Sequence, residues 1–172
     1  MDRPGAKPRF VAQAAKDARD FYERTIDMRL STKGRYAVMA MADLAQRGGE
    51  RAVTLAEIAA RQDISLAYLE QLFSRLRRRG LVKSVRGPGG GYQLARPAGQ
   101  MPVADIVMAV DEPLKAVRCS SSAKGCMPGG ERCLTHDLWD GLGHRIHEYL
   151  ASVSLDDVVS GRLRKQRAME AA

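Results

Sequence analysis

Apolar residues recur at intervals of three and four in the first half of the chain, which is the spacing of one face of an α-helix. The first such stretch begins at Ser31, and Gly48 and Gly49 follow it as residues that favour the end of a helix. We therefore predict a helix between these points. Its apolar face consists of Ala37, Ala40, Met41 and Leu44.

Two shorter helices are predicted next. Thr54 and Glu57 fit a capping box, in which each side chain bonds the backbone N–H of the other at the start of a helix. Ser65 is placed to cap the following helix, and Gly80 to end it. The apolar face of this third helix consists of Leu69, Leu72, Phe73 and Leu76.

The spacing changes after Gly80. Residues 81–86 and 92–94 suit two strands, and the glycine-rich residues 87–91 suit the turn between them. Helices followed by a β-hairpin in this order are typical of a winged helix-turn-helix domain. We predict such a domain over residues 28–100.

A long helical pattern occupies the last third of the chain. A short helix opened by Pro102 precedes a glycine-rich loop over residues 118–133, and an amphipathic helix of about 20 residues, about 30 Å long, begins at Leu134. A helix of this length extends beyond the small domain before it and suits dimerisation. The predicted fold is mainly α-helical with a small β-hairpin wing, a loop and dimerisation helix over residues 101–160, and a flexible basic tail over residues 161–172.

The basic charge is concentrated in the predicted winged-helix segment. The chain has 28 Lys and Arg residues against 20 Asp and Glu residues, a formal charge of +8. Residues 1–27, 28–100 and 101–172 contribute +1, +8 and −1. A localised basic surface fits a polyanion such as DNA, and a surface kept basic for solubility is the alternative.

Composition narrows the class of protein. The 172 residues are 45% hydrophobic and 28% charged, which excludes a wholly disordered chain. We find no apolar run of about 18 residues and no signal-peptide pattern, so we expect a cytoplasmic protein with no membrane partner. Residues 1–27 are expected to be an extension, either disordered or ahead of a native start at Met28.

The third predicted helix has a polar face that suits contact with DNA. Its N-terminal part would enter the major groove, where Gln pairs with adenine, Glu accepts from cytosine and Arg binds guanine or phosphate. We expect base contacts first and phosphate contacts from the arginines further along. A solvated helix face is the alternative. The face consists of Ala67, Tyr68, Glu70, Gln71, Ser74, Arg75 and Arg78.

The glycine-rich turn after Arg86 suits a wing rather than a nucleotide-binding loop. No Lys-Ser or Lys-Thr pair follows, and the next element is a strand, so no helix N-terminus is available for a phosphate. Glycines let the backbone approach DNA closely, and Arg86 brings charge to the narrow minor groove. An ordinary tight turn is the alternative.

All three cysteines lie in the predicted loop, at Cys119, Cys126 and Cys133, and His136 follows them. Clustered Cys and His residues in a cytosolic protein indicate metal more often than disulfides. Structural zinc usually uses closely paired cysteines, whereas single, widely spaced thiolates suit an iron-sulfur cluster in which imidazole replaces one thiolate. The positive end of the long helix would favour an anionic centre. A solvent-facing imidazole is the alternative for His136.

Four stretches match a known pattern in order: residues 28–37 (MRLSTKGRYA), 64–73 (ISLAYLEQLF), 85–92 (VRGPGGGY) and 132–136 (RCLTH). They closely resemble the family of IscR-type iron-sulfur cluster regulators over roughly residues 28–159. The resemblance implies a homodimeric transcription factor that binds double-stranded operator DNA and a 2Fe-2S cluster held by three Cys and one His. It also implies that the cluster comes from the iron-sulfur assembly machinery. The loaded form would repress the genes of that machinery, and the cluster-free form would still bind a second class of sites.

The resemblance assigns roles to particular residues. Cys119, Cys126, Cys133 and His136 would hold the cluster, and Tyr68, Glu70, Gln71, Arg86 and Pro88 would face DNA. We add Arg29, Lys33, Arg75, Arg78 and Gly87 to the predicted DNA surface.

Two departures from the family pattern bear on these roles. Ala67 stands where the family can carry a DNA-contacting serine, so one polar contact is missing. The loops between the cysteines are slightly long, which leaves a 4Fe-4S cluster or zinc as less favoured alternatives to a 2Fe-2S cluster.

The predicted function is therefore a DNA-binding regulator that senses iron-sulfur cluster status. A regulator that responds to nitric oxide, thiol redox state or zinc on the same scaffold is the alternative. An enzyme that uses Cys and His as nucleophile and base is not favoured, because the loop is glycine-rich and the sequence places no second catalytic group and suggests no substrate pocket.

Overall fold

The computed structural model describes residues 32–49, 51–110, 127, 131–163 and 168–169. All of them belong to one compact unit, residues 31–172. Arg29, Cys119, Cys126 and the extension over residues 1–27 lie outside the described residues.

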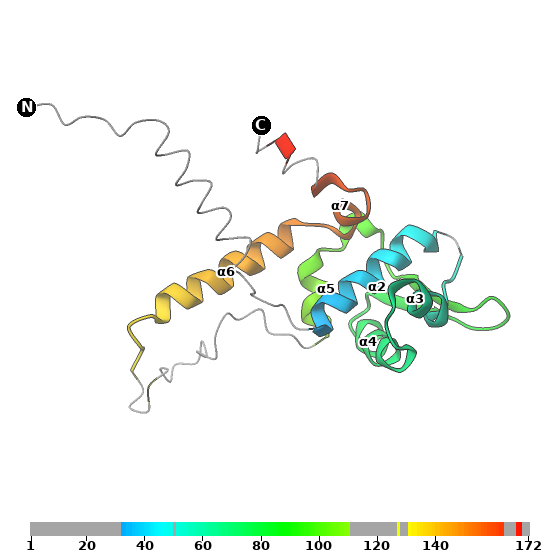
Figure 1. Ribbon diagram of the computed structural model, residues 1–172, viewed down its shortest axis with the longest axis horizontal. Helices are drawn as coiled ribbons and strands as arrows, with labels where there is room; N and C mark the ends of the chain where they lie inside the picture. The colour runs from blue at the N-terminus through cyan, green and yellow to red at the C-terminus, as the bar shows by residue number, and fades with distance from the viewer. Residues whose placement is uncertain (1–31, 50, 111–126, 128–130, 164–167, 170–172) are drawn as a thin grey trace, which may run out of the picture. The chain divides into compact units, whose positions relative to one another are not determined.

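The three predicted helices of the winged-helix segment are confirmed (Figure 1). They are α2 (Thr32–Gly48), α3 (Leu55–Gln62) and α4 (Leu66–Arg78). The predicted capping box is present at the start of α3, where Thr54 Oγ1 accepts from the Glu57 N–H at 3.2 Å and the Thr54 N–H donates to Glu57 Oε2 at 2.8 Å. Ser65 caps α4 by accepting from the Tyr68 N–H at 3.3 Å. Local side-chain chemistry thus sets where both helices begin.

The predicted hairpin is also confirmed, as β1 (Val82–Val85) and β2 (Gly91–Leu94) in antiparallel register. An unpredicted bridge joins Val53 to Tyr92 through two backbone hydrogen bonds of 2.9 and 2.8 Å. A Cβ at Gly91 would lie 2.5 Å from the Val53 carbonyl oxygen, so the close approach requires glycine. The base of the hairpin is therefore fixed to the residues that lead into α3.

Three helices with defined bounds among the described residues follow the hairpin region, together with the short 3-10 turn η1 (Ala98–Gln100). They are α5 (Val103–Ala109), α6 (His136–Ser152) and α7 (Leu155–Val159). Helix α6 is somewhat shorter at its start than the predicted amphipathic stretch, because Thr135 is its N-cap. Sequence periodicity did not indicate η1 or α7, since each is too short to complete two turns. No helix among the described residues is long and apolar enough to cross a membrane.

The hydrophobic core joins the winged-helix elements to residues beyond position 100. Phe73 on α4 is fully buried and meets the Tyr92 ring with centroids 4.9 Å apart. The same core includes Met101, Ile106 and Leu155 from the η1–α5 and α7 regions. Helices α5 and α7 both contact α2. The hydrophobic residues that hold α4 in place thus come from both sides of the predicted domain boundary at residue 100.

Candidate nucleic-acid interface and metal ligands

The N-terminal half of α4 presents polar side chains to solvent. Glu70 and Gln71 are exposed, as the sequence predicts. Tyr68, also predicted on this face, is half-buried, and its ring meets the Tyr36 ring edge to face with centroids 6.0 Å apart. The Arg35 guanidinium carbon lies 5.6 Å from the centroid of the Tyr36 ring, within cation–π range. The contact between the Tyr36 and Tyr68 rings joins the start of α2 to the start of α4.

The arginines at the end of α4 do not share one environment. Arg77, Arg78 and Arg79 are exposed, whereas Arg75 is half-buried. Arg75 Nη1 donates to the Val110 carbonyl oxygen at 3.2 Å. One predicted phosphate contact therefore has part of its guanidinium turned toward the protein.

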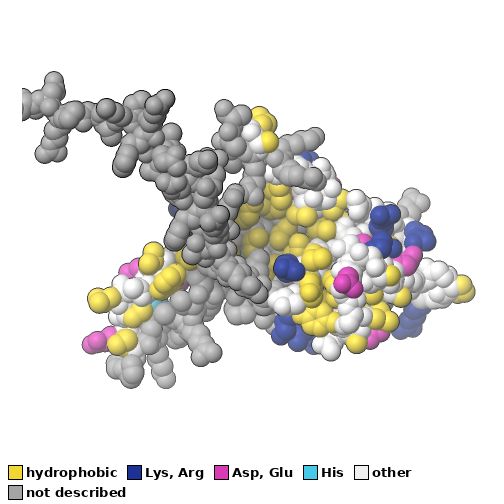
Figure 2. Space-filling model, in the orientation of Figure 1, with side chains coloured by type: hydrophobic (Ala, Val, Ile, Leu, Met, Phe, Trp, Pro, Cys, Tyr) yellow, Lys and Arg dark blue, Asp and Glu magenta, His cyan; other side chains and the backbone are white. Residues whose placement is uncertain are grey.

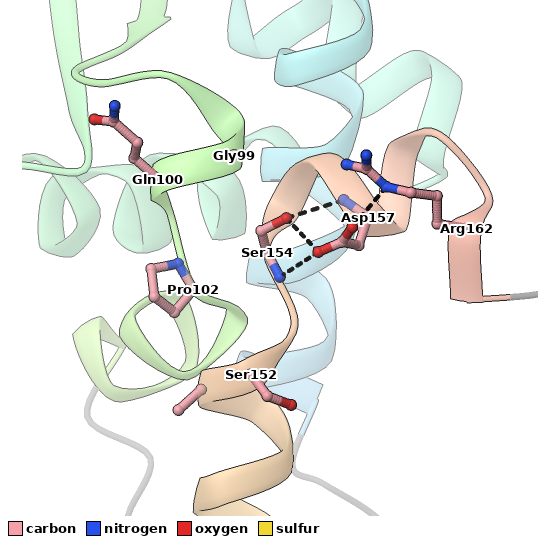
Figure 3. A pocket seen from close by; sticks show the side chains of 8 residues that line it. Gly99, Gln100, Pro102, Ser152, Ser154, Asp157 and Arg162 are labelled. Carbon is pink, nitrogen blue, oxygen red and sulfur yellow. Dashed lines mark hydrogen bonds and ion pairs between the residues drawn. The ribbon is translucent and has the colours of Figure 1, made fainter. Parts of the chain in front are cut away.

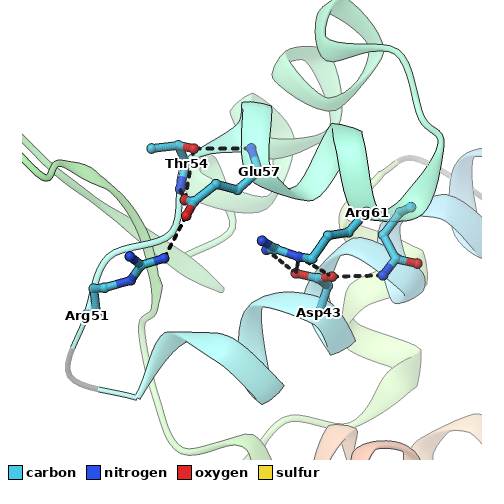
Figure 4. Close-up of polar contacts among 6 residues, drawn as sticks. Asp43, Arg51, Thr54, Glu57 and Arg61 are labelled. Carbon is cyan, nitrogen blue, oxygen red and sulfur yellow. Dashed lines mark hydrogen bonds and ion pairs between the residues drawn. The ribbon is translucent and has the colours of Figure 1, made fainter.

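An ion pair fixes α3, the helix that supports α4, against α2 (Figure 4). Arg61 Nε lies 3.1 and 3.0 Å from the two Asp43 carboxylate oxygens, and Arg61 Nη2 lies 2.6 Å from Oδ1. Gln62 donates to the same carboxylate at 2.8 Å. Burial alone would raise the pKa of Asp43, but the hydrogen bonds from Arg61 and Gln62 and the charge of Arg61 hold it below its ordinary value.

A second carboxylate stabilises the start of α3. The hydrogen bonds from the Thr54 N–H and hydroxyl, together with the Arg51 guanidinium, lower the pKa of Glu57 to about 2. Glu57 is therefore ionised at neutral pH and remains a capping acceptor.

The hairpin tip presents the predicted wing residues Arg86, Gly87 and Pro88, all exposed. Gly87 has a φ of +99°, a conformation that favours glycine. A Cβ at Gly90 would lie 2.5 Å from the Val85 carbonyl oxygen, so the tip closes more tightly than a residue with a side chain permits. The tip is a compact loop with one cationic side chain at its base.

Lys33 is exposed in the first turn of α2. Together with the α4 face and the hairpin tip, it completes the predicted DNA residues that the structure describes, since Arg29 lies outside that part of the chain. Figure 2 shows Lys and Arg side chains at the winged-helix end of the visible face. The sequence analysis did not indicate the contacts of Arg35 and Tyr36 beside Tyr68, although both residues fall within the first matched stretch.

Two of the four predicted metal ligands are described. Cys133 is half-buried just before α6, and His136, the first residue of that helix, is 7% exposed. The His136 N–H donates to the Cys133 carbonyl at 3.0 Å, and Cys133 Sγ lies 3.7 Å from Thr135 Oγ1. The solvent-facing alternative for His136 is therefore wrong, because the residue is buried.

These two residues have donor atoms that fit an iron-sulfur cluster or zinc, namely a thiol sulfur and an imidazole nitrogen. Their place at the start of α6 favours the thiolate, since the positive end of the helix dipole lies there. Among the described residues, no three His, Cys, Asp or Glu side chains gather into a group able to hold a metal. Cys119 and Cys126 are outside that set.

Helix α6 has an apolar face that the described part of the chain leaves largely uncovered. Leu138 is 65% exposed and Tyr149 is 60% exposed, while Leu134 just before the helix is fully exposed. Figure 2 shows hydrophobic side chains along this end of the molecule. At the far end of the helix, Leu150 instead packs on Val103 and Val107 of α5. One end of α6 is thus anchored, and the rest offers an apolar surface.

Comparison with known proteins places these features in context. A family model described as "Rrf2: Iron-dependent Transcriptional regulator" matches residues 30–161. The HTH-type transcriptional regulator IscR of Xenorhabdus nematophila is 57% identical over 135 residues, which cover 78% of this chain and 81% of that protein. The protein of the same name from Photorhabdus laumondii is 56% identical over an equal length.

Solved structures agree with these matches. The structure of T. potens IscR has a TM-score of 0.65 and 40% identity, covering 80% of this chain and 90% of that one. The structure of CymR, the global cysteine regulator of B. subtilis, has a TM-score of 0.64 and 36% identity, covering 77% of this chain and 96% of that one.

Proposed function

The chain belongs to the Rrf2 family of transcriptional regulators, and from this premise we propose that it is a homodimeric regulator whose choice of operator depends on an iron-sulfur cluster. The family consists of DNA-binding regulators, not enzymes. The observation that carries the proposal is the Cys133 and His136 pair at the start of α6, with the imidazole buried, in a chain that matches an iron-dependent regulator family.

The first part of the proposal concerns DNA. Helix α4 enters the major groove with Glu70 and Gln71 at base edges, where a carboxylate accepts from cytosine and an amide pairs with adenine. Tyr68 lies beside them and is held by its contact with Tyr36. Cations contact phosphates: Lys33 and Arg78, which are exposed, and Arg29, which lies outside the described residues.

The wing makes the second DNA contact. Its exposed tip, formed by Gly87 and Pro88, approaches the backbone, and Arg86 inserts its charge into the minor groove. The main support is the local concentration of charge, because the whole formal excess of +8 lies in residues 28–100.

The second part concerns assembly. A second copy of the chain covers the apolar face of α6 that carries Leu138 and Tyr149, since two such helices can bury each other's exposed side chains. A two-fold dimer of this kind would place two α4 helices on two half-sites of one operator.

The third part concerns the ligands. Cys119, Cys126, Cys133 and His136 hold a 2Fe-2S cluster, which the iron-sulfur assembly machinery supplies. When bound, the cluster supplies a redox-active centre that is sensitive to oxygen and nitric oxide. The chain contributes three thiolates, one buried imidazole and the positive end of α6, which favours the anionic ligand set. Loss or gain of the cluster reports the cell's supply of iron-sulfur clusters. The regulated genes are those of cluster assembly.

A thiol-responsive regulator on the same scaffold is a second candidate. It is favoured by the likeness to CymR. The B. subtilis protein of that name is described as a global cysteine regulator, and a solved structure of the Staphylococcus aureus protein is described as its oxidised form. In that case the three cysteines would respond to oxidants or bind zinc without sulfide.

A triple cysteine variant tests the main proposal, and the iron and acid-labile sulfide content of the wild type separates it from the second candidate. Replacing Cys119, Cys126 and Cys133 with Ala should abolish cluster binding and change which operators are bound, while the thermal unfolding of the winged-helix core stays near that of the wild type. Full iron content with unchanged operator preference in the triple variant would contradict the proposal.

A further inference from the structure

Arg75 occupies a different environment from the other arginines at the end of α4. Arg77, Arg78 and Arg79 are exposed, but Arg75 is half-buried and its Nη1 donates to the carbonyl oxygen of Val110 at 3.2 Å. The two residues are 35 positions apart in the sequence. The contact therefore joins the predicted recognition helix to the end of α5.

The acceptor of this bond is a group that needs a partner. Val110 is the C-cap of α5, and its side chain is fully buried. Carbonyls at the end of a helix have no intrahelical donor, and the negative end of the helix dipole attracts a cation. A guanidinium meets both needs. Val110 also belongs to the same hydrophobic core as Leu72 and Leu76 of α4, so the bond crosses an interface that is already packed.

Helix α5 is held at its other end by the region where α6 meets α7. The Val103 N–H donates to the Val153 carbonyl at 2.9 Å, and the Leu155 N–H donates to the Met101 carbonyl at 2.8 Å. Figure 3 shows this junction, with Pro102 next to Ser154 and the Ser154–Asp157–Arg162 contacts that close the start of α7. Helix α5 thus links the C-terminal end of α6 to α4, the predicted recognition helix.

The same helix leads into the part of the sequence that carries the ligands. Val110 is followed nine residues later by Cys119, and the ligand-bearing stretch ends at His136, the first residue of α6. In the sequence, that stretch therefore begins at the C-terminal end of α5, where Arg75 is bonded.

We infer that Arg75 is a positioning residue, which couples the state of the cysteine-bearing stretch to the placement of α4 through the Val110 carbonyl. The inference rests on the proposed function, since it gives the route by which cluster occupancy alters operator choice. It also replaces the sequence-based interpretation of Arg75 as a phosphate contact. That interpretation makes an opposite prediction in the experiment below.

The first measurement uses cluster-free protein and so does not depend on the cluster. The salt dependence of operator binding is compared for the wild type, Arg75→Met and the matched exposed control Arg78→Met. Loss of one phosphate contact should lower the slope of log affinity against log salt by about one. We expect this loss in Arg78→Met and an unchanged slope in Arg75→Met. A loss in Arg75→Met equal to that in Arg78→Met would overturn the inference.

The second measurement compares cluster-loaded and cluster-free forms of each protein on the two kinds of operator. For each operator, the affinity of the cluster-loaded form is divided by that of the cluster-free form. We expect this ratio to fall several-fold toward one in Arg75→Met and to stay at the wild-type value in Arg78→Met. Arg75→Lys keeps the charge and one donor, so it should recover part of the ratio. A wild-type ratio preserved in Arg75→Met would also overturn the inference.

The wild type separates this inference from the proposed function. A ratio of one in the wild type contradicts cluster-dependent operator choice itself, and the role of Arg75 fails with it. A large wild-type ratio that Arg75→Met retains contradicts only the role of Arg75. If Arg75→Met is poorly folded by circular dichroism, Arg75→Lys and Arg75→Gln give the same two comparisons.

Discussion

Arg61 and Asp43 form a two-point ion pair, with the Arg61 Nη2 nitrogen 2.6 Å from the carboxylate Oδ1 and Nε within 3.1 Å of both oxygens. Asp43 is 5% exposed, so its charge has almost no contact with water. The pair joins α2 to the end of α3, directly before the turn that leads into α4. Helix α3, which packs against α4, is therefore held by a buried charge that lies outside the predicted DNA-contact residues.

We expect Asp43→Asn to destabilise the protein by about 2 kcal/mol, because hydrogen bonds to a charged group are worth about 1.5–3 kcal/mol and the guanidinium would lose its counter-charge. Urea unfolding monitored by circular dichroism measures this. The control is Arg51→Ala, which removes an exposed ion pair with Glu57 and should change stability by less than about 1 kcal/mol. Equal stabilities for the two variants would show that the buried ion pair contributes no more to the free energy of unfolding than the exposed one.

Stability should fall in acid, and Glu57 should account for part of the fall. Its pKa is lowered from 4.5 to about 2, so its contribution is complete above pH 4.5 and is lost as the pH decreases toward 2. The lowered pKa of Asp43 acts in the same direction. Denaturant midpoints measured through this range should decline less steeply in Glu57→Gln than in the wild type. An identical decline in both would mean that the capping carboxylate does not titrate as described.

Glu70 should determine base preference, and Arg78 should not. Removing a base-edge contact costs about 1–3 kcal/mol of discrimination, so Glu70→Ala should relax the preference at one position of the operator. Arg78→Met should weaken binding to all sequences about equally. Competition binding against a set of single-base operator variants distinguishes the two effects. Uniform weakening by Glu70→Ala would place that side chain away from the base edges.

Leu138 should contribute to the dimer interface. The side chain is 65% exposed on the apolar face of α6, and Leu138→Lys would place a charge there. We expect the dimer dissociation constant to rise about tenfold or more in analytical ultracentrifugation. Leu66→Lys changes an exposed leucine on α4 and serves as the control, with no expected change. A dimer unaffected by Leu138→Lys would place the interface elsewhere.

Replacing His136 tests the proposed imidazole ligand without removing the cluster. His136→Cys should keep an iron-sulfur cluster with a lower reduction potential, because a thiolate carries a negative charge and a neutral imidazole does not. Redox titration followed by visible absorption measures the shift. His147 is exposed further along α6, so His147→Ala should leave the potential unchanged. The same potential in His136→Cys and the wild type would exclude His136 as a ligand.

The winged-helix elements could be predicted because their signals are local. The Thr54–Glu57 capping box, the Ser65 cap and the change of spacing after Gly80 each lie within a few residues of the feature that they determine. Helix α7 was missed because five residues give no periodicity, although Ser154 and Asp157 form a capping box that could have indicated it.

Contacts between distant parts of the chain were not accessible from the sequence. The linear pattern grouped Arg75 with the exposed arginines of α4, since nothing nearby indicates that Val110 lies within hydrogen-bond distance. The burial of His136, the ring contact between Tyr36 and Tyr68 and the ion pair of Asp43 with Arg61 are tertiary in the same way. Candidate ligands and DNA contacts could thus be proposed from residue type and spacing, whereas these contacts between distant residues required the fold.

The absorption spectrum and the iron and acid-labile sulfide content of protein purified without air test the central claim most directly. The account predicts charge-transfer bands in the visible range, about two iron and two sulfide per chain, and loss of both in a Cys133→Ala variant that remains folded. Wild-type protein that contains zinc without sulfide, or that keeps its full iron and sulfide content in Cys133→Ala, would contradict it.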